Sequence, residues 1–322
     1  MSIRSLLIAT ALGGVVSVVH AATPASLAQF SATLDAQWNY GKPAESEARF
    51  RRELAPWPAG DPQALVIATQ IARSQALQRQ FAAAHATLDA VAAKLHGAPS
   101  HVRVRYLLER GRTFNSSGSP ERAVSLFVEA LELAQCNDDA FYAVDAAHML
   151  GIAAPVAVRL DWNRKALAMA EQSSDARARR WLAPLYNNIG HTWLEQGDYA
   201  QALDNFRKAL PAYEQRGDPE AVRVARWSIA RAQRSLGALD DAERTQRALV
   251  VESEGAGAPD GYVYEELAEI AVARGDPAAA APWAAKAYGL LKDDPDLKAS
   301  APARLDRLSQ LASGAKTATA KP

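Results

Sequence analysis

Apolar and polar residues follow a helical period along most of the chain, in pairs of segments that a short turn separates. The clearest pair spans residues 185–210, LYNNIGHTWLEQGDYAQALDNFRKAL. Large aromatic residues recur in it six or seven residues apart, which is about two helical turns. Small residues fall where two helices must approach closely. These are Tyr186, Trp193, Tyr199 and Phe206, and Gly190, Ala202 and Ala209. The pattern predicts two antiparallel helices joined at the turn GDY.

The same turn signal recurs along the chain at intervals of about 38 to 41 residues. Its positions are Gly41, Arg79, Gly118, a degenerate site near Ala157, Gly197, Gly237 and Gly275. A fixed period in this range indicates a repeat array, in which each unit buries its apolar face only against its neighbours. We therefore expect about six or seven helix pairs over residues 25–291.

The unit around Gly197 resembles the tetratricopeptide repeat. The first-helix and second-helix patterns of that family correspond to Tyr186, Ile189-Gly190 and Trp193, and to Ala202, Phe206 and Ala209. The units around Gly118, Gly275, Gly237 and Arg79 follow the same pattern less closely. The resemblance implies an all-α fold, an α-solenoid of antiparallel helix pairs wound into a right-handed superhelix. It also implies a protein-binding scaffold.

The repeats are longer than the usual unit of about 34 residues. The extra residues fall between the second helix of one unit and the first helix of the next, for example in residues 211–222. They predict second helices lengthened by about one turn, since 3.6 residues make a turn. The chain thus resembles the long-repeat variety of the family, with about 38–41 residues per unit.

The N-terminus has the pattern of a bacterial export signal. Arg4 precedes the uncharged apolar stretch 5–19, and small residues end it at Ala21. We expect a signal peptide over 1–21, cleavage after Ala21, a periplasmic or secreted protein, and no stable membrane insertion after cleavage. An uncleaved anchor is the alternative, although the stretch is short for a spanning helix of about 20 residues.

The C-terminus predicts a cap. Residues 292–312 turn polar and then offer the amphipathic stretch 302–312, PARLDRLSQLA, which can cover the last apolar face of an array. The polar tail 313–322 is expected to be disordered. Cys136, the single cysteine, excludes an intrachain disulfide; a small buried side chain is favoured over an intermolecular bridge.

Charge and motifs exclude several classes of function. Lys and Arg total 36, as do Asp and Glu, so no global field attracts nucleic acid. The six histidines form no HExxH or other metal-ligand spacing, and no glycine-rich phosphate loop is present. We therefore expect neither an enzyme nor a cofactor or metal.

Recognition is the remaining chemistry. In the family that the chain resembles, certain first-helix positions face a concave groove. Transferred to this sequence, they predict a partner-binding groove formed by Arg112, His148, Asn187, Asn188, His191, Trp227, Arg231, Arg234, Glu265, Glu266 and Glu269. The groove would have a mixed polar and basic centre and an acidic C-terminal rim. The competing interpretation is that Arg231 or Arg234 pairs with Glu265 or Glu269 of the adjacent first helix.

The expected function is a protein-protein interaction scaffold in the bacterial cell envelope, which grips a peptide or helical element of another protein. The alternative is a structural subunit that oligomerises through its convex face or its ends. An accessory cell-envelope enzyme ranks third.

Overall fold

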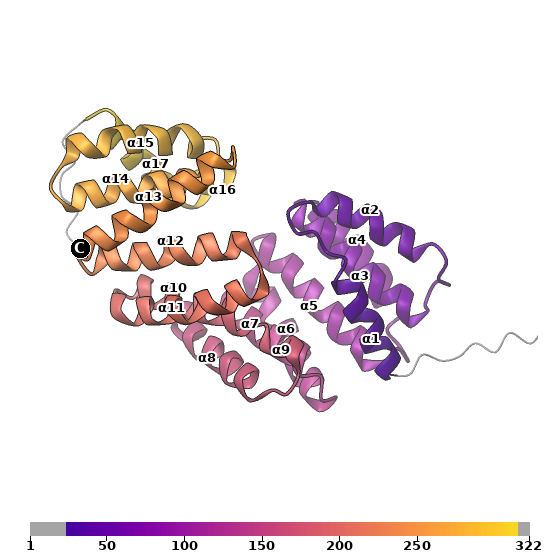
Figure 1. Ribbon diagram of the computed structural model, residues 1–322. Coiled ribbons are helices and arrows are strands. Elements are labelled where there is room, and N and C mark those ends of the chain that lie inside the picture. The colour runs from indigo at the N-terminus through magenta and orange to yellow at the C-terminus, as the bar shows by residue number, and fades with distance from the viewer. Residues whose placement is uncertain (1–23, 315–322) are drawn as a thin grey trace, which may run out of the picture. The chain divides into compact units, whose positions relative to one another are not determined.

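The computed structural model describes residues 24–314, and all regular structure in this range is helical. The chain divides into two compact units, one ending at Arg103 and the other beginning at Val104, so the boundary falls inside α5 (Ser100–Ser116). The first unit contains α1 (Pro24–Asp35), α2 (Pro43–Leu54), α3 (Pro62–Leu77) and α4 (Phe81–Ala92). Figure 1 shows the course of the helices along the chain.

The second unit continues the antiparallel pairs. After α5 it contains α6 (Pro120–Cys136), α7 (Ala140–Ala153), α8 (Val156–Gln172), α9 (Ala176–Arg179), α10 (Leu182–Glu195), α11 (Tyr199–Arg216), α12 (Pro219–Ser235), α13 (Leu239–Gly255), α14 (Gly261–Ala273), α15 (Pro277–Leu291), α16 (Pro295–Ser300) and α17 (Pro302–Ala312). In Figure 1, α10–α11, α12–α13 and α14–α15 follow one another as helix pairs. The all-α solenoid of helix pairs is confirmed.

Left-handed residues mark the turns between helices. Among the predicted turn positions, Arg79, Gly118, Gly197, Gly237 and Gly275 have positive φ. A second set lies between the pairs, at Gly60, Gly97, Asp138, Gly217 and Gly257. Glycine adopts this conformation without a Cβ penalty, which explains its use at helix ends. The backbone therefore turns about every half repeat, alternately within a pair and between pairs.

Lengthened helices account for the long repeat. In the second unit α6, α8 and α13 have 17 residues each and α11 has 18. The prediction placed the extra turn in the second helices alone, and this was wrong, because the first helices α5 and α12 also have 17 residues. Aspartates cap several first helices; the carboxylate of Asp218, for example, accepts a hydrogen bond from the Ala221 N–H at 3.0 Å.

Close packing within two pairs depends on a glycine facing a phenylalanine. A Cβ added to Gly111 would lie 2.5 Å from the Phe127 ring, and one added to Gly190 would lie 2.6 Å from the Phe206 ring. Both phenylalanines are completely buried. The absent side chain therefore makes room for the ring of the partner helix.

The degenerate repeat has a different turn. Its two helices, α7 and α8, are joined at Ala154 and Pro155 in extended backbone, close to the site predicted near Ala157. Here a Cβ on Gly151 would meet the Asn163 amide at 2.4 Å. The helices therefore still pack tightly, but with a polar residue in place of the phenylalanine.

The predicted cap is present. Helix α17 packs against α15 and buries Leu305, Leu308 and Leu311. Its other face carries Asp306, Ser309 and Gln310, which are exposed. The apolar face at this end of the second unit is therefore covered by a helix that shows polar residues to solvent.

The remaining expectations concern the two termini, membrane insertion and Cys136. The predicted signal peptide 1–21 and tail residues 315–322 lie outside the described residues. Over residues 24–314, none of the helices combines the length and apolar character that a membrane crossing requires. Cys136 is exposed, so the expected burial was wrong: it is the last residue of α6, beyond the last buried position, Ala134.

Candidate functional site

The predicted groove residues of the second unit lie on its first helices, and most of them contact the neighbouring first helix or the cap. We call the resulting row of polar contacts the polar ladder. It consists of Arg112, Asp145, His148, Asn188, His191, Arg231, Arg234, Glu265, Glu266, Glu269, Arg304 and Arg307. It crosses α5, α7, α10, α12, α14 and α17 in that order.

At its first step, α5 contacts α7. The Arg112 guanidinium donates to the carboxylate of Asp145 on α7 and, at 2.7 Å, to that of Glu109 on its own helix. Both carboxylates are almost completely buried. A largely buried cation between two buried anions is held by charge-assisted hydrogen bonds, so this end of the ladder is a rigid internal contact.

The next step joins α7 to α10. Asn188 Nδ2 lies 2.9 Å from Nε2 of His148, and the imidazole packs on the Trp181 ring at a centroid distance of 4.6 Å. Asn188 therefore positions His148 between two repeats. The neighbouring Asn187 keeps a buried Oδ1 with no hydrogen-bond partner among the described residues.

Between α10 and α12, the charge of Arg231 acts electrostatically on His191. Burial, and to a smaller extent the charge of Arg231, lowers the pKa of His191 from 6.5 to about 4. The edge of the His191 ring meets Phe206 at a centroid distance of 4.9 Å. His191 is therefore neutral at pH 7, as its cationic neighbour requires.

This lowered pKa predicts a loss of stability in mild acid. The unfolded chain takes up the His191 proton near pH 6.5, whereas the folded chain does so only near pH 4. The contribution is therefore present above pH 6.5 and is lost as the pH falls; between pH 7 and 5 the loss is about 2 kcal/mol. Urea denaturation of the wild type and of His191→Gln at both pH values measures it. The variant should lose less stability on acidification, and equal losses would contradict the prediction.

Helices α12 and α14 are joined through Glu266. Arg234 donates two hydrogen bonds to its carboxylate, at 2.7 and 3.1 Å, and Arg231 Nε lies 3.7 Å away. The competing sequence interpretation predicted a pair between these helices, and this is confirmed. Its choice of Glu265 or Glu269 as the acceptor was wrong, because Glu266 is the carboxylate that points toward α12.

Glu265 and Glu269 instead hold the cap. Arg304 and Arg307 of α17 each donate two hydrogen bonds to one carboxylate, Arg304 to Glu265 and Arg307 to Glu269. Paired Arg and carboxylate groups of this kind fix both position and angle. Each of the three carboxylates of the expected acidic rim, Glu265, Glu266 and Glu269, is thus neutralised by an arginine.

Arg231 is the member of this C-terminal part that reaches solvent most. Its side chain is 36% exposed, against 21% for Arg234, and its guanidinium lies over the Trp227 ring at 5.4 Å. Trp227 Nε1 donates to the Tyr262 carbonyl at 3.1 Å. Arg and Trp are residue types enriched at binding hot spots, and here a partly exposed arginine stacks on a fixed indole.

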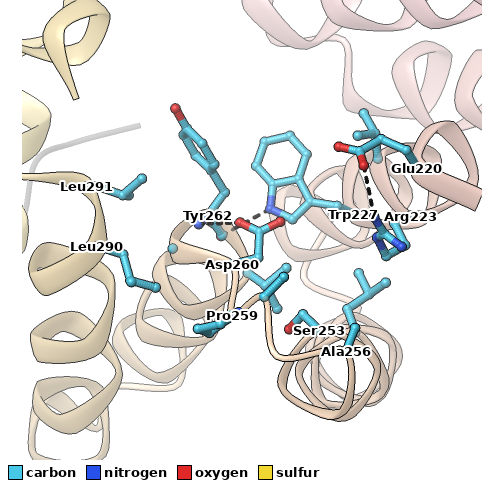
Figure 2. A pocket seen from close by; sticks show the side chains of 15 residues that line it. Glu220, Arg223, Trp227, Ser253, Ala256, Pro259, Asp260, Tyr262, Leu290 and Leu291 are labelled. Atoms are coloured by element: carbon cyan, nitrogen blue, oxygen red, sulfur yellow. Dashed lines mark hydrogen bonds and ion pairs between the residues drawn. The ribbon is translucent and has the colours of Figure 1, made fainter. Parts of the chain in front are cut away.

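A cavity of about 690 Å³ opens beside Trp227 (Figure 2). Its walls come from α12, the end of α13, the loop before α14, and the end of α15, and they are mainly apolar. Val224, Tyr262, Leu290 and Leu291 line it together with Trp227. Trp227 therefore joins the two features: its ring carries Arg231 of the polar ladder and also lines the cavity.

Sequence reasoning missed some of these residues. Asp145 lies three residues before His148, so the two share a helix face, and the sequence spacing alone could have identified Asp145 as a further groove residue. Arg304 and Arg307 lie three apart in the predicted cap, where their pattern shows only an amphipathic helix. In addition, no group of three or more His, Cys, Asp or Glu residues between 24 and 314 is arranged to hold a metal ion.

Comparison with known proteins shows which folds the chain is similar to. Residues 181–250 match the family model of the tetratricopeptide repeat. No curated protein sequence matches the chain significantly. Among solved structures, the apo form of RapI has a TM-score of 0.64 at 10% identity, covering 88% of this chain and 80% of that one. NprR in complex with its cognate peptide NprX has a TM-score of 0.60 at 12% identity, covering 91% and 84%.

A third structure is the PH0952 signal-transduction ATPase of Pyrococcus horikoshii, which has a tetratricopeptide repeat sensor. Its TM-score is 0.63 at 15% identity, covering 89% of this chain. This chain spans only 44% of that protein. The fold is thus that of a helical-repeat solenoid. More particularly, it is similar to tetratricopeptide repeat proteins, and residues 181–250 carry the repeat pattern itself.

Proposed function

We propose that residues 104–314 bind a segment of another protein along the first-helix face, with Arg231 and Trp227 at the centre of the contact. The observation that carries this is the partly exposed Arg231 stacked on Trp227, beside a cavity that the same indole lines. A preformed surface on stacked helices binds a segment with little ordering of its own side chains. The protein-binding scaffold that the sequence predicts is compatible with this arrangement.

The contacts divide the predicted groove residues into two groups. Arg112, His148, Asn188 and Glu266 contact neighbouring repeats and set the geometry of the face. Trp227 and Arg231 also contact α14, through the Tyr262 carbonyl and Glu266, but in addition they offer an aromatic surface and a partly exposed cation. We assign the contact with the partner to this second group and the positioning of the repeats to the first.

The alternative is a structural subunit that associates through its convex face or its ends. The polar outer face of α17 weighs against association at the C-terminal end of the second unit, because Asp306, Ser309 and Gln310 would have to lose water there. Binding of a different protein is therefore the function that we favour.

In-cell photo-crosslinking tests the proposed contact. A photoreactive amino acid at position 231 should capture a protein partner, whereas one at Arg244, which is 74% exposed on the second helix α13, should not. With a reporter at Ser235, one turn further along α12 on the same side as Arg231, Arg231→Ala should lower capture at least tenfold and Arg244→Ala should leave it unchanged. Equal capture from positions 231 and 244 would contradict the proposal.

The same experiment addresses the cellular compartment. We propose export to the bacterial envelope, supported by the charged start, apolar stretch and small residues of positions 1–21. Mass spectrometry of the recovered protein should find Ala22 as its first residue. An N-terminus that still carries residues 1–21 would favour the uncleaved anchor.

A further inference from the structure

The cavity beside Trp227 exists because one residue of its repeat is small. Tyr213 lies sixteen residues after the turn glycine Gly197, and Ser253 lies sixteen residues after Gly237. Tyr213 is 9% exposed and packs against Ala183 of its own repeat and Ala225 of the next repeat. Ser253 occupies the corresponding position one repeat later, and there the cavity opens.

The residues around the two positions also correspond. Ala183, Ala221 and Ala225 pack around Tyr213; at the equivalent positions of the next repeat, Arg223, Pro259 and Val263 line the cavity. A smaller cavity of about 320 Å³ lies at the equivalent place in the α6–α7–α8 region, where Ala134 stands sixteen residues after Gly118. Small residues at this repeat position therefore accompany a cavity, and Tyr213 fills the corresponding space with its ring.

The walls of the larger cavity select the chemistry of the occupant. Val224 of α12 and Leu290 of α15 are each 46% exposed and line the cavity. Trp227 and Tyr262 add aromatic surface (Figure 2). Its volume lies within the range of about 300–1,000 Å³ that ligand sites occupy, which is more than one side chain needs. Two adjacent bulky apolar side chains would fit inside it.

The mouth of the cavity is acidic. Glu220 and Arg223 form an ion pair at 3.0 Å and neutralise each other. The carboxylate of Asp260, which caps α14 by accepting a hydrogen bond from the Tyr262 N–H at 2.8 Å, also lines the cavity (Figure 2). Burial raises the pKa of Tyr262, and the nearby carboxylates of Asp294 and Asp260 raise it further, so a second carboxylate lies close to the same wall. Arg304 is also near Tyr262 but is paired with Glu265.

We propose that this cavity is the anchor site for the partner segment, and that it takes two neighbouring bulky apolar residues flanked by a lysine or arginine that binds Asp260. This rests on the proposed function, since it names the part of the partner that the face recognises. Apolar burial supplies the affinity, and the acidic mouth selects the flanking charge.

Labelled peptides of defined sequence test the anchor site. The probes are fluorescein-labelled twelve-residue peptides of Ser and Gly with a central Leu-Phe flanked by Lys. One matched peptide carries Glu in place of Lys, and another carries Ala-Ala in place of Leu-Phe. Measured by fluorescence anisotropy with the full chain, the Lys-flanked Leu-Phe peptide should bind at least tenfold more tightly than either control. Equal binding of the three peptides overturns the proposal.

Two variants connect binding to the cavity. Ser253→Tyr copies the side chain of the preceding repeat and should weaken binding at least tenfold by filling the space. Val224→Arg places a cation at the mouth and should have the same effect. Val251→Arg is its matched control, because Val251 is 73% exposed and does not line the cavity. Circular dichroism checks the fold, and Val224→Arg keeps the test decisive if Ser253→Tyr does not fold.

Other occupants give distinct results. Binding of the apolar dye anilinonaphthalene sulfonate that Ser253→Tyr abolishes, without peptide binding, would assign the cavity to a small molecule and overturn the proposal. A dimer that Val224→Arg dissociates would assign it to a second copy, with the same consequence. If crosslinking from position 231 continues in Ser253→Tyr at full yield, the anchor site fails while the proposed function stands. If position 231 captures nothing, the proposed function itself fails.

Discussion

Replacing Gly190 with leucine will unfold the second unit. The site has no room for a single extra carbon, since a Cβ would already lie 2.6, 2.7 and 3.1 Å from three atoms of the completely buried Phe206 ring. Overpacking of a core usually costs about 1–3 kcal/mol per substitution, and a branched four-carbon side chain at a helix crossing exceeds that range. Circular dichroism should show a large loss of helix at 25 °C, with Gly190→Ala intermediate at about 1–3 kcal/mol.

The chain itself suggests the control and the rescue. Gly289 lies inside α15 with nothing within 4 Å of an added Cβ, so Gly289→Ala should be neutral or stabilising by up to about 1 kcal/mol. At the positions equivalent to Gly190 and Phe206, the Arg79 repeat has Ala72 and Leu88, both completely buried. Adding Phe206→Leu to Gly190→Ala should therefore recover stability relative to Gly190→Ala alone. Additive losses would show that the ring contact is not the cause.

The pairing of small and large residues explains why the fold could be predicted from the sequence. The turn glycines and the helix-packing residues are local signals, because the residues that meet in one pair, such as Gly190 and Phe206, are sixteen apart in the chain. A repeat multiplies each signal, so the Gly111 and Phe127 contact supports the same interpretation. The degenerate repeat was the weakest match because Asn163 and an extended Ala154–Pro155 turn replace those residues.

The candidate site could be predicted only in part. The first-helix positions were identified, and the structure brings Asn188 to His148 and Arg231 to Glu266. Which carboxylate meets which arginine depends on the rotation of each helix, and one residue changes the direction by about 100°. This is why Glu266 rather than Glu265 faces α12. The cavity depends on a side chain that is small relative to its equivalent, Ser253 against Tyr213, and a comparison of the repeats could have revealed it.

Replacing Glu266 with glutamine is expected to have the second largest effect. The carboxylate is 5% exposed and receives Arg234 in two hydrogen bonds, with Arg231 at 3.7 Å. Burial already lowers the pKa of Arg231, and Glu266 is the first neighbour that opposes this. Breaking a buried ion pair by removing one partner costs about 3–5 kcal/mol. Because both arginines are partly exposed, we expect a loss of about 2–3 kcal/mol.

Urea denaturation with a double-mutant cycle measures this contribution. Glu266→Gln combined with Arg234→Gln should be less destabilising than the sum of the single variants, because the second change removes the cation that the first leaves unpaired. Asp204→Asn is the matched control, since its pair with Lys208 is more than half exposed on both sides and should contribute less than about 1 kcal/mol. A Glu266→Gln effect no larger than that of Asp204→Asn would mean that the α12–α14 contact is held by apolar packing and that the polar ladder does not fix the spacing of these repeats.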